Sequence, residues 1–289
     1  MKVLSPAKIN LFLQVAGKRG DGYHELVTLM CCISLYDVIR MDCNTAKISV
    51  QCDTIEVPKG ETNLAYQAAG LFYGTMKQDS AGRKKVAGAE GVSIFIEKNI
   101  PVAAGLGGGS SNAASVLKGL NAHYGHPFTL SQLSAMGLRI GADVPYLLYR
   151  KPAIARGIGE KLTPYKGLSS MPVLVICPDF QVATARVYKN LNLRLTKCEK
   201  KIKNFCFEVP AFNARRHLCN DLETVTIADH PEIKEIKKTL LELGAEGALM
   251  SGSGPSVFGL FADRRRMRRA CETLKKASSW RLYAAELLV

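Results

Sequence analysis

The chain has 289 residues, 47% of them hydrophobic, and a formal net charge of +14. This length accommodates two domains or one large one, and the composition is that of a globular protein. No apolar run is long enough to span a bilayer, and Lys8 and Asn10 interrupt any signal-peptide pattern at the start. We therefore expect a cytoplasmic protein, and the positive charge favours anionic ligands such as nucleotides or nucleic acid.

The nine cysteines are scattered through apolar segments, and none forms a Cys-x-x-Cys pair. This pattern favours buried free thiols in a reducing compartment over disulfides or a zinc site.

The first predicted strand covers residues 6–15, with Ile9, Leu11, Leu13 and Val15 on one face. Lys8 and Asn10 share the other face. Two readings stay open for this pair: a solvated sheet edge, or the lining of a polar pocket. A turn at residues 20–24 follows, then strands at 27–33, 37–41 and 47–52, a helix over 63–76 and an exposed loop over 78–91.

A glycine-rich loop runs from Pro101 to Ser111, between a strand predicted at 92–98 and a helix whose apolar spacing starts at Ala113. A helix begins with unpaired N–H groups and partial positive charge, which favour phosphate, and glycines let the backbone approach an anion closely. The loop lacks the Gly-Lys-Ser/Thr of a P-loop and the third glycine of the dinucleotide fingerprint. It therefore predicts another kind of nucleotide loop, with a cation supplied from elsewhere in the chain.

Thr129 and Gln132 form the pattern of a capping box for a helix ending near Gly141. Asp143 follows it. Two readings are open for Asp143: an N-cap for a turn with Pro145 early in it, or a carboxylate presented beside the glycine-rich loop.

The second half alternates strands and helices, so we expect an α+β fold with domains at 1–155 and 156–289. A strand over 173–177 precedes a helix within 179–190 that carries Thr184 and Tyr188, an irregular stretch to 215, and helices from 220 and over 231–243. Two strands within 247–261 flank a Ser/Gly loop at 251–256. A helix then follows Asp263, with a strand over 283–289. The basic run Arg264–Arg269 opens the helix that follows Asp263, and we interpret it as a solvated helix face.

Three motifs occur in order: Pro6-Ala7-Lys8-Ile9-Asn10-Leu11, the loop Gly105-Leu106-Gly107-Gly108-Gly109-Ser110-Ser111, and Gly252-Ser253-Gly254-Pro255-Ser256. Together they resemble the GHMP kinases, the superfamily of galactokinase, homoserine kinase and mevalonate kinase. With the turn Asp21-Gly22-Tyr23-His24 and with Gly141-Ala142-Asp143-Val144-Pro145, the chain is most similar to the 4-diphosphocytidyl-2-C-methyl-D-erythritol kinases.

The resemblance implies a two-domain GHMP kinase fold, with an N-terminal domain like domain 2 of ribosomal protein S5, a ferredoxin-like C-terminal domain, and the active site between them. It implies transfer of the γ-phosphoryl of ATP, with Mg²⁺, to the 2-hydroxyl of 4-diphosphocytidyl-2-C-methyl-D-erythritol in the non-mevalonate route to isoprenoids. The expected partner is this small molecule, not nucleic acid or a membrane, and we expect a monomer or weak homodimer.

The resemblance also implies roles for single residues. Asp143 is the expected base, Lys8 its cationic neighbour, and Asn10 orients Lys8 or the substrate. Tyr23 and Tyr188 stack on the cytosine ring, His24 bonds its edge and Thr184 assists. Either Ser110 or Ser111 contacts the metal. The residues implied for ATP are Lys98 and Asn63 at the adenine and, around the phosphates, Pro101, Val102, Ala103, Ala104, Gly105, Leu106, Gly107, Gly108, Gly109, Ser110 and Ser111.

Two alternatives remain. One is another small-molecule GHMP kinase of the homoserine or mevalonate type, although a small aliphatic alcohol needs no stacking surface such as Tyr23 and Tyr188. The other is a basic nucleic-acid-binding protein, although the aromatic residues are not interleaved with the arginine runs and no RNA-recognition motif occurs.

Overall fold

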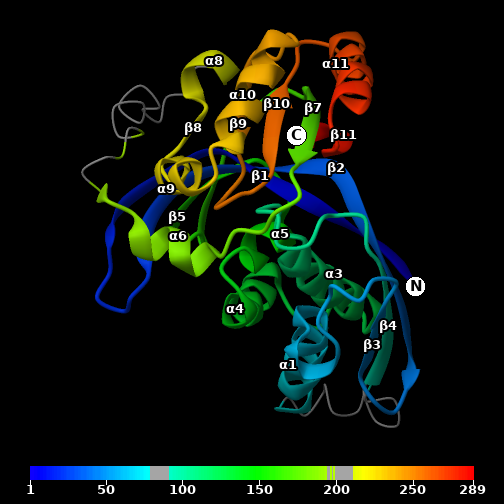
Figure 1. Ribbon diagram of the computed structural model, residues 1–289. Coiled ribbons are helices and arrows are strands. Elements are labelled where there is room, and N and C mark those ends of the chain that lie inside the picture. Colours follow the sequence, from blue (N-terminus) through cyan, green and yellow to red (C-terminus); the bar gives the residue numbers. More distant parts are fainter. Residues whose placement is uncertain (79–90, 194–195, 197, 199–210) are drawn as a thin grey trace. The chain divides into compact units, whose positions relative to one another are not determined.

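The computed structural model describes all residues except 79–90, 194–195, 197 and 199–210 (Figure 1). The chain forms two compact units, each assembled from three separate segments. The first unit contains Met1–Ala7, Tyr36–Val102 and Gly107–Arg150, and the second contains Lys8–Leu35, Ala103–Leu106 and Lys151–Val289. Nearly all of the loop predicted at 78–91, and much of the irregular stretch at 190–215, lie outside the described residues.

Two long strands supply backbone to both units. These are β1 (Lys2–Lys18) and β2 (His24–Thr45). The strands expected separately at 27–33 and 37–41 are one continuous strand, because Ser34, Leu35 and Tyr36 between them include no glycine or proline to end it. The expected turn at 20–24 separates β1 from β2.

In the first unit, as far as the structure describes it, a small sheet is accompanied by helices. β4 (Gly91–Glu97) pairs antiparallel with β2, Val38 opposite Glu97, and parallel with β3 (Ser49–Cys52). A short 3₁₀ turn, η1 (Gly60–Thr62), precedes the helices. The helices are α1 (Leu64–Gln78), α3 (Gly108–His123), α4 (Leu130–Ile140) and α5 (Val144–Tyr149). Among them α1 packs on α3 and α4, and α5 packs on α3 and α4.

The ends of α4 and α5 are fixed by side chains. The predicted capping box is confirmed, because the Thr129 hydroxyl accepts from Gln132 N while the Gln132 side chain accepts from Thr129 N. After α5, Arg150 adopts a positive φ of 62°. Its guanidinium donates to Leu147 O, to Leu4 O and to Ser115 Oγ. Arg150 thus ties the end of α5 to β1 and α3 within this unit.

The second unit is built on the remaining strands. The N-terminal part of β2 pairs with β5 (Ala153–Gly157), which pairs with β6 (Lys161–Pro164). A second run of strands continues from β2 through β11 (Arg281–Leu288), β7 (Pro172–Cys177) and β10 (Val257–Leu260) to β9 (Gly247–Met250). β8 (Cys219–Asn220) lies parallel to β1. The sequence did not predict β5 and β6, because both are short and lie among the glycines of 157–159.

Helices cover one face of this sheet. They are α6 (Thr184–Asn190), α8 (Ala214–His217), α9 (Glu223–Asp229), α10 (Glu232–Glu242) and α11 (Arg264–Ala277). Buried residues of α10 and α11, such as Ile236 and Leu274, share one core with Leu174, Ile176 and Met250 of the strands. This mixture of strands and helices confirms the expected α+β class. None of the described helices is long and apolar enough to cross a membrane.

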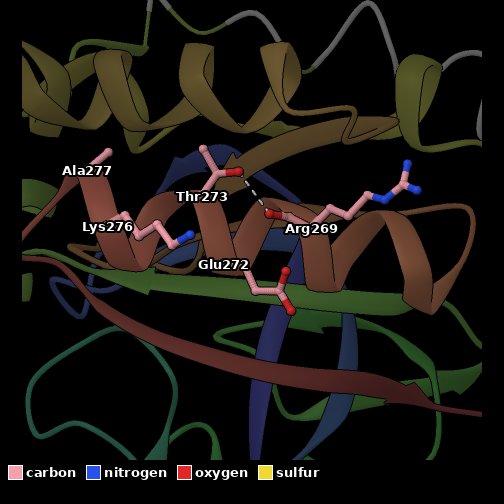
Figure 2. A pocket seen from close by; sticks show the side chains of 5 residues that line it. All are labelled: Arg269, Glu272, Thr273, Lys276 and Ala277. Carbon is pink, nitrogen blue, oxygen red and sulfur yellow. Dashed lines mark hydrogen bonds between the residues drawn. The ribbon is translucent and has the colours of Figure 1, made fainter.

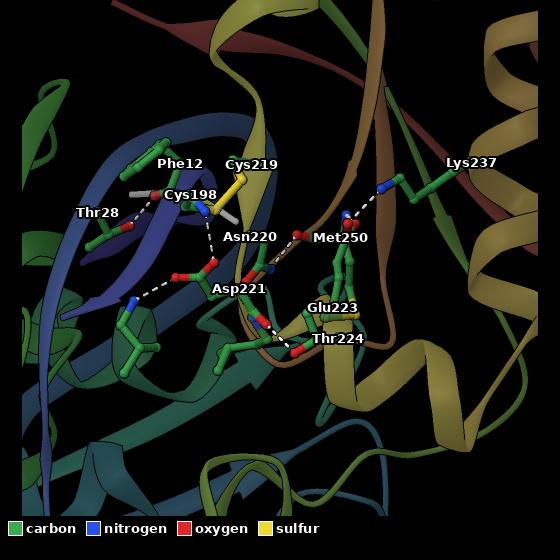
Figure 3. Close-up of a disulfide and its surroundings, with 12 residues drawn as sticks. Phe12, Thr28, Cys198, Cys219, Asn220, Asp221, Glu223, Thr224, Lys237 and Met250 are labelled. Atoms are coloured by element: carbon green, nitrogen blue, oxygen red, sulfur yellow. Dashed lines mark hydrogen bonds and ion pairs between the residues drawn. A yellow bond between two sulfur atoms is a disulfide. The ribbon is translucent and has the colours of Figure 1, made fainter. Parts of the chain in front are cut away.

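One expectation about the cysteines is wrong. Cys198 and Cys219 form a disulfide in the second unit, with a Cα–Cα distance of 5.7 Å (Figure 3). The carboxylate of Asp221, which is 1% exposed, accepts from Cys198 N at 3.1 Å and from Val15 N at 3.0 Å. Asp221 thereby brings Cys198 beside the strand that carries Cys219. Sequence spacing could not reveal this pairing, because the bridged residues are 21 positions apart and share no motif.

We predict that Cys219→Ser lowers the unfolding free energy of the oxidised protein by about 3 kcal/mol, because opening the bridge releases the loop that it closes in the unfolded chain. The measurement is urea unfolding with and without a dithiol reductant. Cys271→Ser is the matched control, since Cys271 is a free, half-buried cysteine and its replacement should leave the reductant effect intact. Wild-type protein whose stability is the same in both conditions would contradict a stabilising bridge.

Candidate functional site

The glycine-rich loop leads into α3 without a side-chain cap. As predicted, a strand (β4) precedes the loop and a helix (α3) follows it. Gly107 is the N-cap of α3, has φ of 69° and offers no side-chain hydrogen bond to the helix. The first-turn N–H groups, and the partial positive charge that they carry, therefore remain for an anion.

The loop at 251–256 holds one part of the glycine-rich loop within the second unit. Ser251 Oγ donates to Gly105 O at 3.0 Å, and Ser256 N donates to Ala104 O at 3.2 Å. Gly105 has φ of 77°, and a Cβ added there would lie 2.2 Å from Ser251 O. Only glycine permits so close an approach of two backbones in this conformation. The two glycine motifs of the sequence thus meet here.

Lys8 and Asn10 are buried, at 5% and 2% exposure, so the reading of this pair as a solvated sheet edge is wrong. Lys8 Nζ donates to Asn10 Oδ1 at 2.8 Å, and Asn10 Nδ2 donates to Thr28 Oγ1 at 2.8 Å. The backbone of Lys8 also donates to Leu106 O at 2.9 Å. The strand that carries this buried ammonium is therefore joined directly to the glycine-rich loop.

The two serines of the loop differ in their surroundings. Ser111 is fully buried, donates to Pro6 O at 2.6 Å and accepts from Ser5 Oγ at 2.8 Å. Its hydroxyl thus holds the start of β1 against α3. Ser110 is half-buried, and its hydroxyl lies near Gly141, where an added Cβ would be 3.7 Å away.

Asp143 occupies the N-cap position of α5, but its side chain makes no capping hydrogen bond. Pro145 lies in the first turn, as expected. The capping role considered for the Asp143 carboxylate is therefore wrong, although its position at the helix start is right.

The residues expected at the adenine make hydrogen bonds within the protein. Asn63 Oδ1 accepts from Ala65 N, and Asn63 Nδ2 donates to Pro58 O, both at 2.8 Å. Lys98 Nζ donates to Asp37 Oδ2 at 2.7 Å and to Ile100 O at 2.6 Å. Asn63 thus fixes backbone at the start of α1 and Lys98 fixes the turn after β4, and their contact with adenine stays a prediction.

Three of the residues expected at the cytosine lie close together in the second unit. The rings of His24 and Tyr188 have centroids 5.2 Å apart, and Thr184, one turn before Tyr188 on α6, bonds Ser253 Oγ at 2.8 Å. Tyr23 is 59% exposed, so its ring face is available to a ligand. Burial, and to a lesser degree the charge of Lys18, lower the pKa of His24, which favours a neutral imidazole able both to donate and to accept.

The described residues offer little for a metal. Their one grouping of histidine, cysteine and acidic side chains with ligand spacing is Cys198, Cys219 and Asp221, and the two cysteines are bonded to each other. A Mg²⁺ ion that is bound chiefly through phosphate oxygens and water needs only one or two protein groups, and the Ser110 hydroxyl suits such a site.

The arginine-rich run forms the exposed face of α11, as expected. Asp263 caps this helix by accepting from Arg266 N, and Met267, Ala270 and Leu274 are buried. A hollow on the helix is lined by Arg269, Glu272, Thr273, Lys276 and Ala277 (Figure 2). It includes none of the residues expected at the active site.

Sequence reasoning assigned no role to Thr28 or Asp37, and it placed Ser253 in the third motif without linking it to Thr184. Thr28 bonds Asn10, Ser253 bonds Thr184, and Asp37 bonds Lys98. Asp37 left a signal that could have found it, because it is a lone acid in the apolar run Leu35-Tyr36-Asp37-Val38-Ile39, and the structure buries its side chain fully.

Comparison with known proteins gives concordant results. The model of the GHMP kinases N terminal domain matches residues 63–151, and that of the GHMP kinases C terminal matches 209–279. A 4-diphosphocytidyl-2-C-methyl-D-erythritol kinase of Syntrophotalea carbinolica is 47% identical over 98% of this chain and 97% of its own length.

Similar solved structures point to the same family as the family models and the relative. A crystal structure of 4-(cytidine 5'-diphospho)-2C-methyl-D-erythritol kinase has a TM-score of 0.77 at 36% identity, covering 99% of both chains. A homoserine kinase from Cytophaga hutchinsonii has a TM-score of 0.74 at 17% identity, over 100% of this chain and 94% of its own, and shares the fold. The resemblance seen in the sequence motifs is confirmed: this chain belongs to the GHMP kinase family.

Proposed function

We propose that this chain transfers the γ-phosphoryl group of ATP to the 2-hydroxyl of 4-diphosphocytidyl-2-C-methyl-D-erythritol, in the cytoplasm, as a step of the non-mevalonate route to isoprenoids. The observation that carries this proposal is the buried Lys8–Asn10 pair on a strand bonded directly to the glycine-rich loop. It supplies the cation that the loop sequence lacks. The choice of acceptor follows the names of the similar proteins and the His24–Tyr188 pair.

The ATP phosphates are bound by the loop from Pro101 to Ser111, over the uncapped first turn of α3. Phosphoryl transfer has a loose transition state, so positioning and charge stabilisation supply most of the catalysis. The N–H groups after Gly107 are fixed before ATP arrives, and therefore need no reorganisation.

Ser110, rather than Ser111, is the proposed contact of Mg²⁺. The Ser111 hydroxyl is buried and already bonded to Pro6 O and Ser5, whereas Ser110 is half-buried. When bound, Mg²⁺ neutralises charge on the phosphate oxygens.

At the alcohol, Asp143 accepts the hydroxyl proton and Lys8 stabilises the negative charge that develops on the oxygen. A carboxylate is a much weaker base than an alkoxide, so the proton moves late, as phosphorylation lowers the pKa of the hydroxyl. Asn10 holds the Lys8 ammonium in one orientation.

At the other end of the acceptor, Tyr23 and Tyr188 stack on cytosine, and His24 bonds the edge of the base with Thr184 nearby. An aromatic side chain offers a large flat surface at a small ordering cost. A homoserine- or mevalonate-type substrate would leave this surface unused.

The direct test is ADP release with ATP and the cytidine compound, against homoserine and mevalonate as alternative acceptors. Of the three acceptors, we expect only the cytidine compound to be phosphorylated. We expect Asp143→Ala to lower kcat by about 10²–10⁴-fold while ATP still binds. Asp179→Asn, a change at an exposed carboxylate, is the control and should keep its activity. Near-normal turnover by Asp143→Ala would refute the base assignment, and so would a co-crystal in which the Asp143 carboxylate lies more than about 3.5 Å from the acceptor hydroxyl.

A pH titration tests His24. Since its folded pKa lies below its ordinary value of about 6.5, the imidazole stays neutral at pH 7 and becomes protonated only as the pH falls below that value. The KM for the cytidine compound should be level from about pH 8 to 6.5 and rise below that range. NMR titration of the ring measures the pKa, and Tyr188→Ala should raise it by exposing the imidazole. A His24 pKa above about 6.5 would contradict the burial argument.

Gly105→Ala should lower kcat/KM by at least about 10²-fold, because the new Cβ would collide with Ser251 O and displace the glycine-rich loop, here called the phosphate loop. Gly125→Ala is the matched control: Gly125 also has a positive φ, 72°, but nothing lies within 4 Å of an added Cβ. It should lose about 1 kcal/mol of stability and keep its activity. Equal losses of activity in both variants would show that the contact with Ser251 is unimportant.

A further inference from the structure

A buried carboxylate organises the turn that leads into the glycine-rich loop. Asp37 of β2 has a fully buried side chain, and it lies beside the end of β4 because the neighbouring residues Val38 and Glu97 are paired. Its Oδ1 accepts from Asn99 N and from Ile100 N, both at 2.8 Å. One carboxylate oxygen thus fixes the two residues immediately before Pro101.

The other oxygen of Asp37 accepts from Lys98 Nζ at 2.7 Å. The side chain of Lys98 is only 6% exposed. The same ammonium donates to Ile100 O at 2.6 Å. The backbone N–H of Lys98 donates in turn to the carboxylate of Asp53, at 3.0 and 3.2 Å. Two acceptors thus orient the ammonium, and Asp53 fixes the backbone of the same residue.

This ammonium lies against the first residue of α3. A Cβ added to Gly108 would be 2.9 Å from Lys98 Nζ and 3.1 Å from Ile100 Cγ2. A full positive charge is thus buried next to the helix end that already carries partial positive charge. Two positive groups side by side favour an anion between or above them and are unfavourable without one.

The carboxylate of Asp37 neutralises the charge of Lys98 beside the N-terminus of α3. A lone buried ammonium beside a helix N-terminus would be costly, and the carboxylate compensates it before any ligand binds. Replacing a buried ion pair by apolar residues is often neutral or stabilising, so stability alone gives a weak reason for this pair. The position of the Asp37–Lys98 pair beside the first residue of α3 gives a stronger reason for its presence.

We propose that Asp37 is a positioning residue for the phosphate loop: it holds the Lys98 ammonium beneath Gly108, so that ATP phosphates meet a cation and a helix N-terminus already in place. This inference rests on the proposed function, since it takes the loop to bind ATP. It gives Lys98 a second function beside its expected place at the adenine.

The test compares Lys98→Met, Asp37→Asn and the double variant, with ATP affinity measured by calorimetry without acceptor, and with kcat and both KM values. Each single variant should weaken ATP binding by about tenfold or more, with the KM of the acceptor and kcat at saturating ATP changed less than threefold. The double variant removes both charges, so it should recover thermal stability relative to Lys98→Met, but not ATP affinity.

Lys237→Met is the matched control, because Lys237 forms a comparable half-buried pair with Glu223 on helices remote in sequence from the loop. It should change stability and leave ATP affinity as in the wild type. A double variant with wild-type ATP affinity, or a folded Lys98→Met with unchanged affinity, would overturn the proposal, since the pair would then serve stability alone. Wild-type protein that binds ATP but does not phosphorylate the cytidine compound would contradict the proposed acceptor and leave this test of Asp37 valid.

Discussion

The geometry of the glycine-rich loop depends on one close approach of two backbones. Gly105 and Ser251 are near enough that a single added carbon would collide with a carbonyl oxygen. The same region receives a hydrogen bond from Ser256 to Ala104 and one from Lys8 to Leu106. Backbone groups have no rotamers to order, so a loop held in this way is set in advance, and binding a ligand there costs less conformational entropy.

Buried polar groups of both units serve the same purpose. Ser111 holds β1 to α3, Asn10 holds Lys8, and Asp37 holds Lys98. Each is a polar or charged group removed from water, which is unfavourable unless its partners are in place. Within each unit such hydrogen bonds hold a strand in one position, because a shifted strand would leave them unsatisfied.

Part of this could be predicted from the sequence, because period-2 spacing put Lys8 and Asn10 on one face, and apolar spacing placed the Gly/Ser run between a strand and a helix. Motif order then identified the family. The remainder depends on contacts between residues distant in the chain. No local pattern predicts that Asp37 bonds Lys98, 61 positions later, or that Cys198 bonds Cys219. Periodicity likewise could not join the two halves of β2, since it gives spacing and not continuity. The domain boundary at 155–156 and the residue roles stay predictions.

The way the chain is distributed between its two compact units limits how this enzyme can be dissected. Each unit takes three separate stretches of sequence, and β1 and β2 contribute backbone to both. A fragment that ends at Arg150 contains all three segments of the first unit but also Lys8–Leu35 and Ala103–Leu106 of the second, and the remainder of the chain lacks those two segments. Exchanging one unit with that of a relative would need several coordinated crossovers. Variation within this family is thus expected to accumulate by substitution inside an intact chain, and chimaeras joined at one point should seldom fold.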